Sequence, residues 1–465
     1  MNINMERKLT AENGITEGVI WKQLLIFFFP ILFGTFFQQL YNTVDAIVVG
    51  NFVGTEALAA VGGATSTIIN LLIGFFVGLS SGATVIISQF YGARDGQNVS
   101  RAVHTAIAMS LIIGLIFMVV GLIFSPMALK AMDTPEDVLP LANTYIRVYF
   151  GGVLFTVIYN VGSAILRAIG DSRRPLYFLI VCCLVNVVLD LLFVAVFHMG
   201  VFGAALATMI SQAISAVLII VTLVRTPDCY RLYPRQIRID IGLLRGIFRI
   251  GLPAGLQSTM YNVANIIIQA SINSFGTETI AAWTAFGKID GMFWMIMDAF
   301  GVSITTFVGQ NFGARKYDRI HKSVRICMAM AMGATVLLST IFLLFGGGIL
   351  GMFTQDAEVL SIGIEIMHVT VPLYFTYVCI TVLSGTMRGT GESLVPMLMT
   401  AVGTCVLRIV WIFTAVPVWH DIKTVMFSYP LTWAVTSVLF LIYYLQGGWL
   451  RRQIRNHFGE QEKQQ

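Results

Sequence analysis

The stretch Gln89–Arg94 (QFYGAR) returns about 221 residues later as Gln310–Arg315 (QNFGAR). A second stretch, Arg167–Asp171 (RAIGD), returns at the same spacing as Arg388–Glu392 (RGTGE). Two shorter matches complete the set: Tyr41-Asn42 with Tyr261-Asn262, and Gly54-Thr55-Glu56 with Gly276-Thr277-Glu278. The chain therefore consists of two copies of one unit, and this internal repeat decides the fold.

The composition places both copies in a membrane. Of the 465 residues, 57% are hydrophobic and 11% are charged, and the mean hydropathy is +0.80, whereas soluble domains carry roughly 25% charged residues. A helix needs about 20 apolar residues to cross the bilayer, and twelve stretches qualify. They are 22–49, 57–81, 101–125, 140–165, 175–197, 201–224, 250–274, 280–308, 323–346, 359–385, 394–417 and 424–446. The sequence predicts an all-α integral membrane protein, with twelve transmembrane helices in two six-helix lobes related by a parallel internal repeat.

The polar segments between these stretches set the expected domains. We expect a cytoplasmic N-terminal tail at 1–21, an N-lobe at 22–224, a cytoplasmic linker at 225–249, a C-lobe at 250–446 and a cytoplasmic C-terminal tail at 447–465. With both termini on one side, 24 of the 29 lysines and arginines fall in segments on that side. Positive charge marks the cytoplasmic face, so the chain is expected to be a multi-pass membrane protein with both termini in the cytoplasm, and the membrane is taken as the inner membrane of a bacterium. The basic linker then reflects orientation, and its length lets the lobes move as separate bodies.

The repeated Arg-x-x-Gly-Asp/Glu motif is interpreted as structural. Its glycine permits a tight turn, and Pro175 or Pro396 then opens the next helix. Arg167 and Arg388 are expected to neutralise helix C-terminal carbonyls or to pair with the acid of the turn. Arg408 lies deeper in a span and is expected to pair with a carboxylate.

Polar residues that the two copies do not share need another explanation, because an ionisable group in mid-membrane costs roughly 2.5–3.5 kcal/mol. Asp45 lies in the first span, and Asn186 and Asp190 project from one face of the fifth. The aligned residues of the second copy cannot titrate at neutral pH: Asn265, Leu407 and Trp411. Two acids that face one small cavity cannot both be ionised cheaply, so one is expected to take up a proton. Alternatively, Asp45 and Asp190 are metal ligands that bind Na⁺ through oxygen. Both alternatives make the pair a cation switch.

Asp298 is the other unshared acid, at a position that matches Val77. Around it lie Met292, Trp294 and Met295, and methionine and aromatic side chains form adaptable apolar surface. An acid in such surroundings favours lipophilic organic cations. These four residues are predicted to line a substrate cavity.

Together these residues carry a family resemblance. The chain resembles the multidrug and toxic compound extrusion (MATE) transporters over essentially its whole length. The resemblance rests on the stretch Tyr41–Gly50 (YNTVDAIVVG), the twice-used Gly-Ala-Arg, the twice-used Arg-x-x-Gly-acid turn, the pair in the fifth span and a threonine in the sixth. It implies two lobes around a central cavity and a coupling-ion site formed by Asp45, Asn186, Asp190, Thr208 and Tyr41. It also makes Asn160 a candidate for the same site.

The seventh span bears on where coupling occurs. Some MATE transporters carry an acidic coupling residue there, whereas the matching stretch Gly255–Met260 (GLQSTM) has none. This difference favours coupling in the first lobe, as in the DinF-like branch of the family.

The expected function is a cation-coupled (H⁺ or Na⁺) antiporter that exports lipophilic, cationic drugs or other xenobiotics by alternating access. Its partners would be membrane lipid and small organic substrates, with no nucleic acid. We expect a monomer with no cofactor other than the coupling ion. A lipid-linked precursor flippase of the same superfamily remains the alternative. An enzyme is not expected, because the sequence shows no metal cluster, nucleophile motif or glycine-rich phosphate loop.

Overall fold

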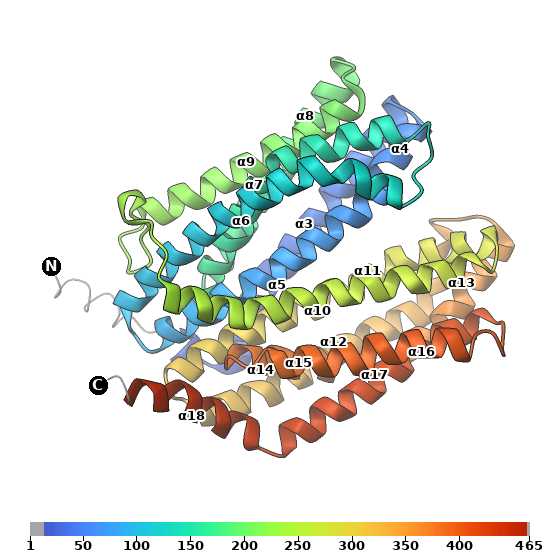
Figure 1. Ribbon diagram of the computed structural model, residues 1–465. Coiled ribbons are helices and arrows are strands. Elements are labelled where there is room, and N and C mark those ends of the chain that lie inside the picture. Colours follow the sequence, from blue (N-terminus) through green and yellow to red (C-terminus); the bar gives the residue numbers. More distant parts are fainter. Residues whose placement is uncertain (1–13, 463–465) are drawn as a thin grey trace. The chain divides into compact units, whose positions relative to one another are not determined.

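Every element in the described part of the chain is helical (Figure 1). The computed structural model describes residues 14–462, with side chains to residue 455, so residues 1–13 and 463–465 of the two expected tails lie outside the described residues. The first-copy helices are α2 (Gly14–Glu17), α3 (Ile20–Phe52), α4 (Thr55–Gly62), α5 (Ala64–Gly92), α6 (Gly96–Ala131), α7 (Leu139–Ala168), α8 (Arg173–Asp190), the π-helix η1 (Leu191–Val196) and α9 (Gly200–Arg225). The later helices are η2 (Pro234–Gln236), α10 (Ile241–Asn273), α11 (Thr277–Gly313), α12 (Tyr317–Gly351), α13 (Ala357–Thr370), η3 (Val371–Leu373), α14 (Phe375–Gly389), α15 (Leu394–Thr400), the π-helix η4 (Ala401–Val406), α16 (Leu407–Thr414), α17 (Ile422–Leu445) and α18 (Gly448–Glu462). The all-α prediction is confirmed.

The helices account for the expected spans with one qualification. Among the described residues, ten helical stretches are long and apolar enough to cross a membrane, and the pair α13–α14, bent by 51°, is an eleventh candidate. The remaining expected span, 250–274, lies within α10 except for its last residue. That helix is 33 residues long, but Gln257, Asn262 and Asn265 make its second half more polar than the other spans.

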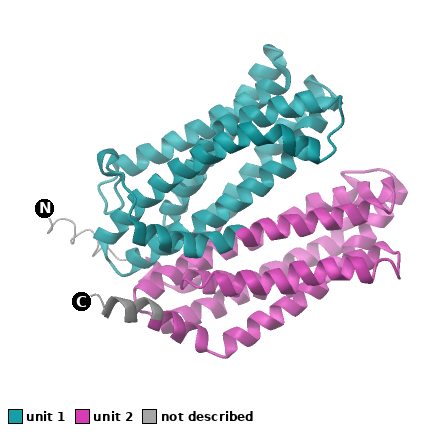
Figure 2. Cartoon of the chain, viewed as in Figure 1, with its two compact units in different colours: residues 1–13, 29–255 teal, residues 14–28, 256–465 magenta. Residues whose placement is uncertain are grey.

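The chain forms two compact units (Figure 2). Of the described residues, unit 1 contains 29–255, and unit 2 contains 14–28 and everything from 256 onward. The boundaries therefore differ from the expected lobes: the start of the first span belongs to unit 2, and the whole linker with the start of α10 belongs to unit 1.

The first described segment packs on unit 2 through polar and aromatic contacts. Arg319 donates from Nε (3.1 Å) and Nη2 (3.0 Å) to the carbonyl oxygen of Ile15. The ring of Phe28 lies 4.3 Å from the ring of Phe300, between centroids. Since a basic side chain stabilises carbonyls at the end of a helix, residues 14–28 are held by the second unit before α3 continues into the first.

The linker is packed against unit 1. The backbone N–H of Tyr233 donates to His104 Nε2 at 3.0 Å, and Arg101 pairs with Asp240 at 2.5 Å. Leu232 is 1% exposed and belongs to the hydrophobic core of unit 1. The linker is thus packed on the unit it follows, because its apolar side chains are buried there, and the expectation that its length lets the lobes move as separate bodies stays a prediction.

Both units use one packing plan. In unit 1, α7 packs against α5, α6 and α9. In unit 2, α14 packs against α11, α12 and α17, which follow the same order along the second copy. The fourth long helix of each copy thus lies at the centre of its unit, in contact with the second, third and sixth.

The backbone at the turns shows the same repeat. Arg94 and Arg315 have positive φ angles of 59° and 57°, and Gly170 and Gly391 have φ angles of 96° and 95°. Glycine adopts this region without a steric penalty, whereas other residues rarely do. Matching residues of the two copies therefore terminate their helices with the same geometry, as expected from the repeated motifs.

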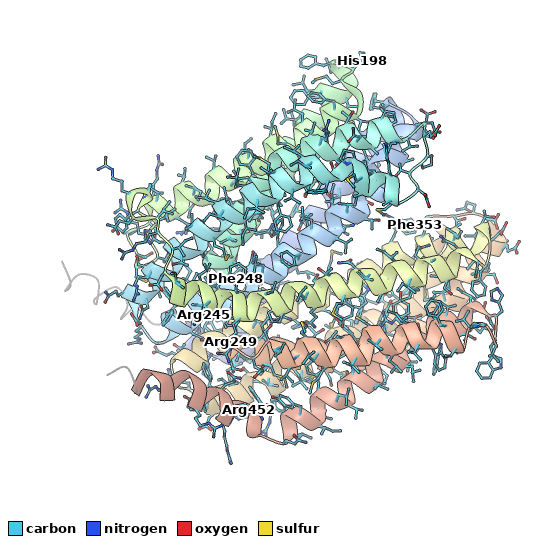
Figure 3. All side chains as sticks on the ribbon, in the orientation of Figure 1. His198, Arg245, Phe248, Arg249, Phe353 and Arg452 are labelled. Atoms are coloured by element: carbon cyan, nitrogen blue, oxygen red, sulfur yellow. The ribbon has the colours of Figure 1, made fainter. Side chains whose placement is uncertain are left out.

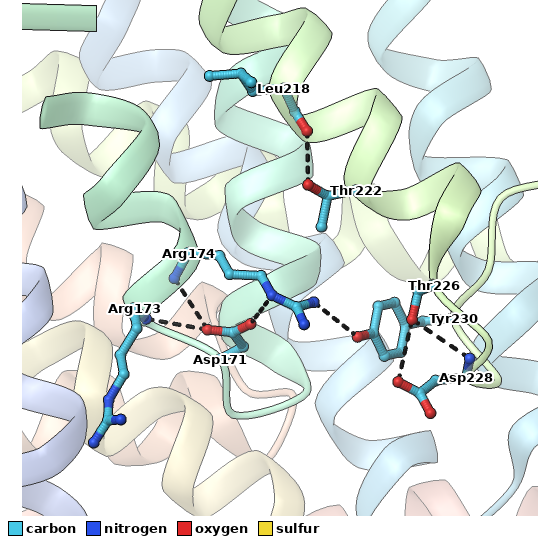
Figure 4. A network of polar contacts seen from close by, with 8 residues as sticks. All are labelled: Asp171, Arg173, Arg174, Leu218, Thr222, Thr226, Asp228 and Tyr230. Carbon is cyan, nitrogen blue, oxygen red and sulfur yellow. Dashed lines mark hydrogen bonds and ion pairs between the residues drawn. The ribbon is translucent and has the colours of Figure 1, made fainter. Parts of the chain in front are cut away.

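The acid of the first repeated turn supports the helix that follows (Figure 4). Asp171 Oδ1 accepts the N–H groups of Arg173 and Arg174, each at 3.1 Å, and Oδ2 pairs with Arg174 Nε at 3.2 Å. Arg174 also donates to Tyr230 of the linker at 3.4 Å. Among the described ion pairs, none joins Asp171 to Arg167. The turn thus caps α8 and holds the linker, and of the two roles expected for Arg167, pairing with the acid of the turn does not occur among the described ion pairs of this copy.

In each unit, the labelled arginines lie at one end of the helices (Figure 3). In unit 1, Arg245 and Arg249 lie at the end opposite His198. In unit 2, Arg452 lies at the end opposite Phe353. Each unit therefore has a basic end, consistent with the distribution of charge along the sequence.

Glycines bring α5 and α10 into close contact within unit 1. A Cβ on Gly82 would lie 2.8 Å from the nitrogen of Gly251, and a Cβ on Gly78 would lie 2.6 Å from the carbonyl carbon of Ala254. Gly78 and Gly82, like Gly251 and Gly255, are four residues apart, the spacing that lets membrane helices approach closely. This contact fixes the first part of α10 to unit 1.

We expect Gly82→Val to lower the free energy of unfolding by about 1–3 kcal/mol, because overpacking forces the two backbones apart. The matched control is Gly151→Val, where an added Cβ meets nothing within 4 Å. Thermal unfolding of the two purified variants in detergent measures the difference. Equal midpoints would show that the α5–α10 contact does not need glycine.

Candidate functional site

Two buried acids lie together inside unit 1. Asp45, in the second half of α3, is 5% exposed, and Asp190, the last residue of α8, is fully buried. The two carboxylates are close enough to interact electrostatically. Asp190 directly precedes the π-helix η1, a kind of distortion that often occurs at functional sites.

Neutral polar side chains from the same two helices and from two further helices, α7 and α9, surround the acids. Tyr145 of α7 donates to Asp45 Oδ2 at 3.4 Å. Asn186 of α8 donates to Thr208 of α9 at 3.5 Å. From the same helix α9, Gln212 donates to the hydroxyl of Tyr41 at 3.5 Å. All of these side chains are buried. We call this group, from Tyr41 and Asp45 to Gln212, the acid cluster.

The acid cluster contains more acceptors than donors. Within the described residues, both carboxylate oxygens of Asp190, Oδ1 of Asp45, Oδ1 of Asn186 and Oε1 of Gln212 are buried without a hydrogen-bond donor. None of the described lysines or arginines forms an ion pair with either acid. A buried charge without a partner is costly. A proton, or a hard cation that takes oxygen ligands, would relieve that cost.

The structure therefore brings together all five residues that the sequence predicted for the coupling-ion site: Tyr41, Asp45, Asn186, Asp190 and Thr208. Their role as an ion site stays a prediction. Among the described residues, no group of three or more His, Cys, Asp or Glu could hold a metal, so Na⁺ would depend on two carboxylates and neutral oxygens. Sequence reasoning missed Tyr145 and Gln212, although both are polar residues within expected spans.

Asn160 makes a local contact instead. Its side chain donates to the carbonyl oxygen of Thr156, one turn earlier in α7, at 2.9 Å. That bond is typical of a polar residue satisfied by its own helix.

Unit 2 contains a half-buried acid that sequence reasoning overlooked. Asp290 of α11 accepts a hydrogen bond from the indole Nε1 of Trp294 at 2.7 Å and another from the hydroxyl of Tyr374. Tyr374 lies between η3 and α14, at the bend of this broken helix. Asp290 could have been found by the criterion that identified Asp45, an acid within a span. Its oxygens are satisfied, so its surroundings differ from those of Asp190.

The predicted substrate residues lie on α11 in different surroundings. Asp298 is exposed within its unit and has Arg388 as its charged neighbour. Met292 is 47% exposed, and Met295 is half-buried. Trp294 packs into unit 2, because its indole N–H binds Asp290. The structure thus leaves Asp298 and Met292 accessible and gives Trp294 a structural contact.

Arg388 and Arg408 of unit 2 donate hydrogen bonds to neutral side chains. Arg388 donates from Nη2 to Gln257 and Ser384, each at 3.4 Å. Arg408 is 2% exposed, donates to Thr432 at 3.1 Å, and places its guanidinium carbon 4.1 Å from the ring centroid of Tyr429. Among the described ion pairs, none joins Arg408 to a carboxylate. The expected pairing is wrong, since a cation–π contact and a hydroxyl satisfy this charge.

Two homologous units of membrane-spanning helices are the architecture of a membrane transporter. A family model described as MatE matches residues 30–192 and 253–414, and the chain belongs to the MatE family. The two matched stretches begin at Pro30 and Pro253 and confirm the internal repeat. Membership also identifies the chain as a transporter rather than an enzyme. Its assignment to the DinF-like branch stays a prediction.

Similar bacterial proteins span nearly the same length. The chain is 27% identical over 436 residues to "Probable multidrug resistance protein YpnP" of Bacillus subtilis (strain 168), covering 93% of this chain and 97% of that protein. It is 28% identical over 446 residues to "Probable multidrug resistance protein YoeA" of the same strain, covering 94% and 95%. It is 22% identical over 400 residues to "Multidrug export protein MepA" of Staphylococcus aureus (strain NCTC 8325 / PS 47), covering 86% and 88%.

Solved structures share the fold. A MOP superfamily transporter from Pyrococcus furiosus, described as having a binding pocket of reverse polarity, matches with a TM-score of 0.88 and 22% identity over 95% of this chain and 99% of its own. The outward-facing conformation of a multidrug resistance MATE family transporter matches with a TM-score of 0.88 and 23% identity over 95% and 99%. These likenesses confirm the fold.

We expect Asp190→Asn and Asp290→Asn to have opposite effects on stability, although the chemical change is the same. Asp290→Asn should cost about 1–3 kcal/mol, because the amide cannot accept both hydrogen bonds from buried donors. Asp190→Asn should leave the stability unchanged or raise it, since it removes a charge without a donor. Thermal unfolding in detergent compares the two. A large loss for Asp190→Asn would show that its carboxylate is satisfied after all.

Proposed function

We propose that this MatE protein is a cation-coupled antiporter that exports lipophilic organic cations from the cell. The observation that carries the proposal is the acid cluster, in which two buried carboxylates lack both a counter-charge and enough donors. A site of this kind gains most from binding H⁺ or Na⁺. The names of the B. subtilis and S. aureus relatives support drugs as the exported class.

The proposed cycle uses the acid cluster as its switch. When Asp45 and Asp190 bind the cation, their mutual repulsion disappears, and the hydrogen bond from Tyr145 is free to rearrange. The helices α3 and α8 then repack, and the affinity for substrate falls on the outer side. Release of the cation on the inner side restores the charges and recruits substrate. One charge moving down 100 mV supplies roughly 2.3 kcal/mol for this cycle, before any concentration gradient is counted.

Both coupling ions fit the donor set. A proton needs only one unpartnered carboxylate oxygen, which Asp190 supplies. Na⁺ needs several oxygen ligands, and carboxylate, amide and hydroxyl oxygens converge in the acid cluster. The choice between them is therefore left to the transport experiment.

The proposed setting follows from charge. The basic end of each unit faces the cytoplasm of a bacterial cell, with both termini on that side of the inner membrane. The protein works as a monomer with lipid and small organic substrates as its partners, and without a cofactor beyond the coupling ion. A lipid-linked precursor flippase is less well supported, because the relatives are named for drug resistance and export.

Asp45→Asn is expected to abolish gradient-driven export while the protein still inserts and folds. The reason is that the variant holds the cluster permanently in a state with one charge fewer. Efflux of a fluorescent organic cation from proteoliposomes, under an imposed pH or Na⁺ gradient, measures the loss and identifies the ion. Glu136→Gln, an exposed acid in the loop between α6 and α7, is the matched control. Wild-type rates in Asp45→Asn would refute the proposed coupling.

Asp298→Asn is expected to raise the half-saturating concentration of a cationic substrate about tenfold, which corresponds to about 1.4 kcal/mol. The carboxylate is accessible and is proposed to attract the positive charge of the substrate. A neutral lipophilic substrate is the internal control and should be transported as by the wild type. An equal effect on both substrates would show that Asp298 supports the structure of α11 instead.

A further inference from the structure

A basic cavity lies in unit 2 where α12 begins. Its volume is about 410 Å³, and four of its lining side chains are basic: Arg315, Lys316, Arg319 and Lys322. Asp318 is the one acid among the lining residues, and Ile20 and Tyr317 complete the wall. α12 is 35 residues long, and the N-terminal end of a long helix favours an anion. We call this feature the basic cavity.

The two copies differ in charge at the repeated turn that lines the basic cavity. Arg315 matches Arg94 in the repeated turn. The next residue is Asp95 in the first copy, where it caps α6 by accepting the N–H of Asn98 at 3.0 Å. The second copy has Lys316 in its place, without a side-chain cap for α12. The second turn therefore has a basic residue, Lys316, at the position where the first turn has an acid that caps a helix.

The chain positions two of these cations with neutral groups. Lys316 Nζ donates to the carbonyl oxygen of Thr16 at 3.0 Å, and Arg319 donates to that of Ile15. Glu17 lies 3.9 Å from Lys316. Carbonyl oxygens orient a cation and leave its charge in place. Among the described residues, the acids at the basic cavity are Asp318 and Glu17, against four basic side chains.

The neighbouring side chains place the basic cavity at the membrane surface. Val19 is 59% exposed and Trp21 is 51% exposed, on either side of the lining residue Ile20. Exposed tryptophan next to apolar residues is typical of the headgroup level of a bilayer. The cavity residues also lie between two spans, 280–308 and 323–346. A ligand there would meet lipid before it met bulk solvent.

We propose that the basic cavity binds the phosphate group of an anionic membrane lipid. Clustered lysines and arginines at the ends of membrane helices attract anionic headgroups, with about 1 kcal/mol for each basic residue. The bound phosphate would contact Arg315 and Lys322 while Lys316 and Arg319 hold residues 14–18 in place. This site is separate from the acid cluster and depends on neither the coupling ion nor the exported substrate.

The test is a titration of purified, delipidated protein in neutral detergent with phosphatidylglycerol, read by native mass spectrometry. The test variant is Arg315→Gln/Lys322→Gln. We expect its affinity for phosphatidylglycerol to be about 10- to 30-fold weaker than that of the wild type, from the loss of two basic contacts. The matched control is Arg94→Gln/Arg325→Gln, which removes the same charge from the first turn and from a position on α12 outside the basic cavity.

Each outcome has one meaning. Weakening in the test variant with wild-type affinity in the control supports the proposal. Equal weakening in both variants overturns it in favour of general surface charge, and equal binding of phosphatidylcholine overturns it as well. If inorganic phosphate occupies the site as tightly as the lipid does, the lipid as ligand is overturned and a free phosphate site is established. Should the double variant fail to fold, Lys322→Gln alone, an exposed position, provides the same comparison with Arg325→Gln.

Discussion

The structure depends on one constraint: inside a bilayer, every backbone N–H and C=O must find its partner within the protein. Long helices meet this requirement directly, and where a helix breaks, side chains can replace the missing bonds. At the broken helix α13–α14, Ser339 donates to the carbonyl oxygen of Val371 at 3.1 Å, and Tyr374 binds Asp290. The breaks are therefore built features that depend on residues from other helices.

The charged side chains of the two units differ in whether they have polar partners. In unit 2, Asp290 has two donors, Arg408 has an aromatic ring and a hydroxyl, and Arg388 has Gln257 and Ser384. In unit 1, Asp190 has neither donor nor counter-charge among the described residues. A buried charge with partners can be explained by structure alone. A buried charge without them calls for a ligand, and this contrast is the reason that the proposed switch lies in the first unit.

The sequence alone predicted what depends on short patterns. The repeat, the apolar spans, the basic ends and the acids of the first unit could all be read from spacing and residue type. It could not predict contacts between distant residues: Asp290 and Tyr374 are 84 positions apart, and Tyr233 and His104 are 129 apart. For the same reason, the partners of Arg408 differ from expectation, and the packing of the linker was not predicted. Both depend on which apolar and aromatic faces meet once the helices pack.

The placement of residues 14–28 in unit 2 has a consequence for the order of assembly. The partners of Ile15, Thr16 and Gly18 are separated from them by 296 to 304 positions. At 5–20 residues per second, a ribosome needs roughly 15–60 s to make that length of chain. Residues 14–18 are therefore made well before their partners, and they cannot dock until the start of α12 has been synthesised. Docking of this segment therefore follows synthesis of the second copy, so an early segment of the chain is among the last to reach its final contacts.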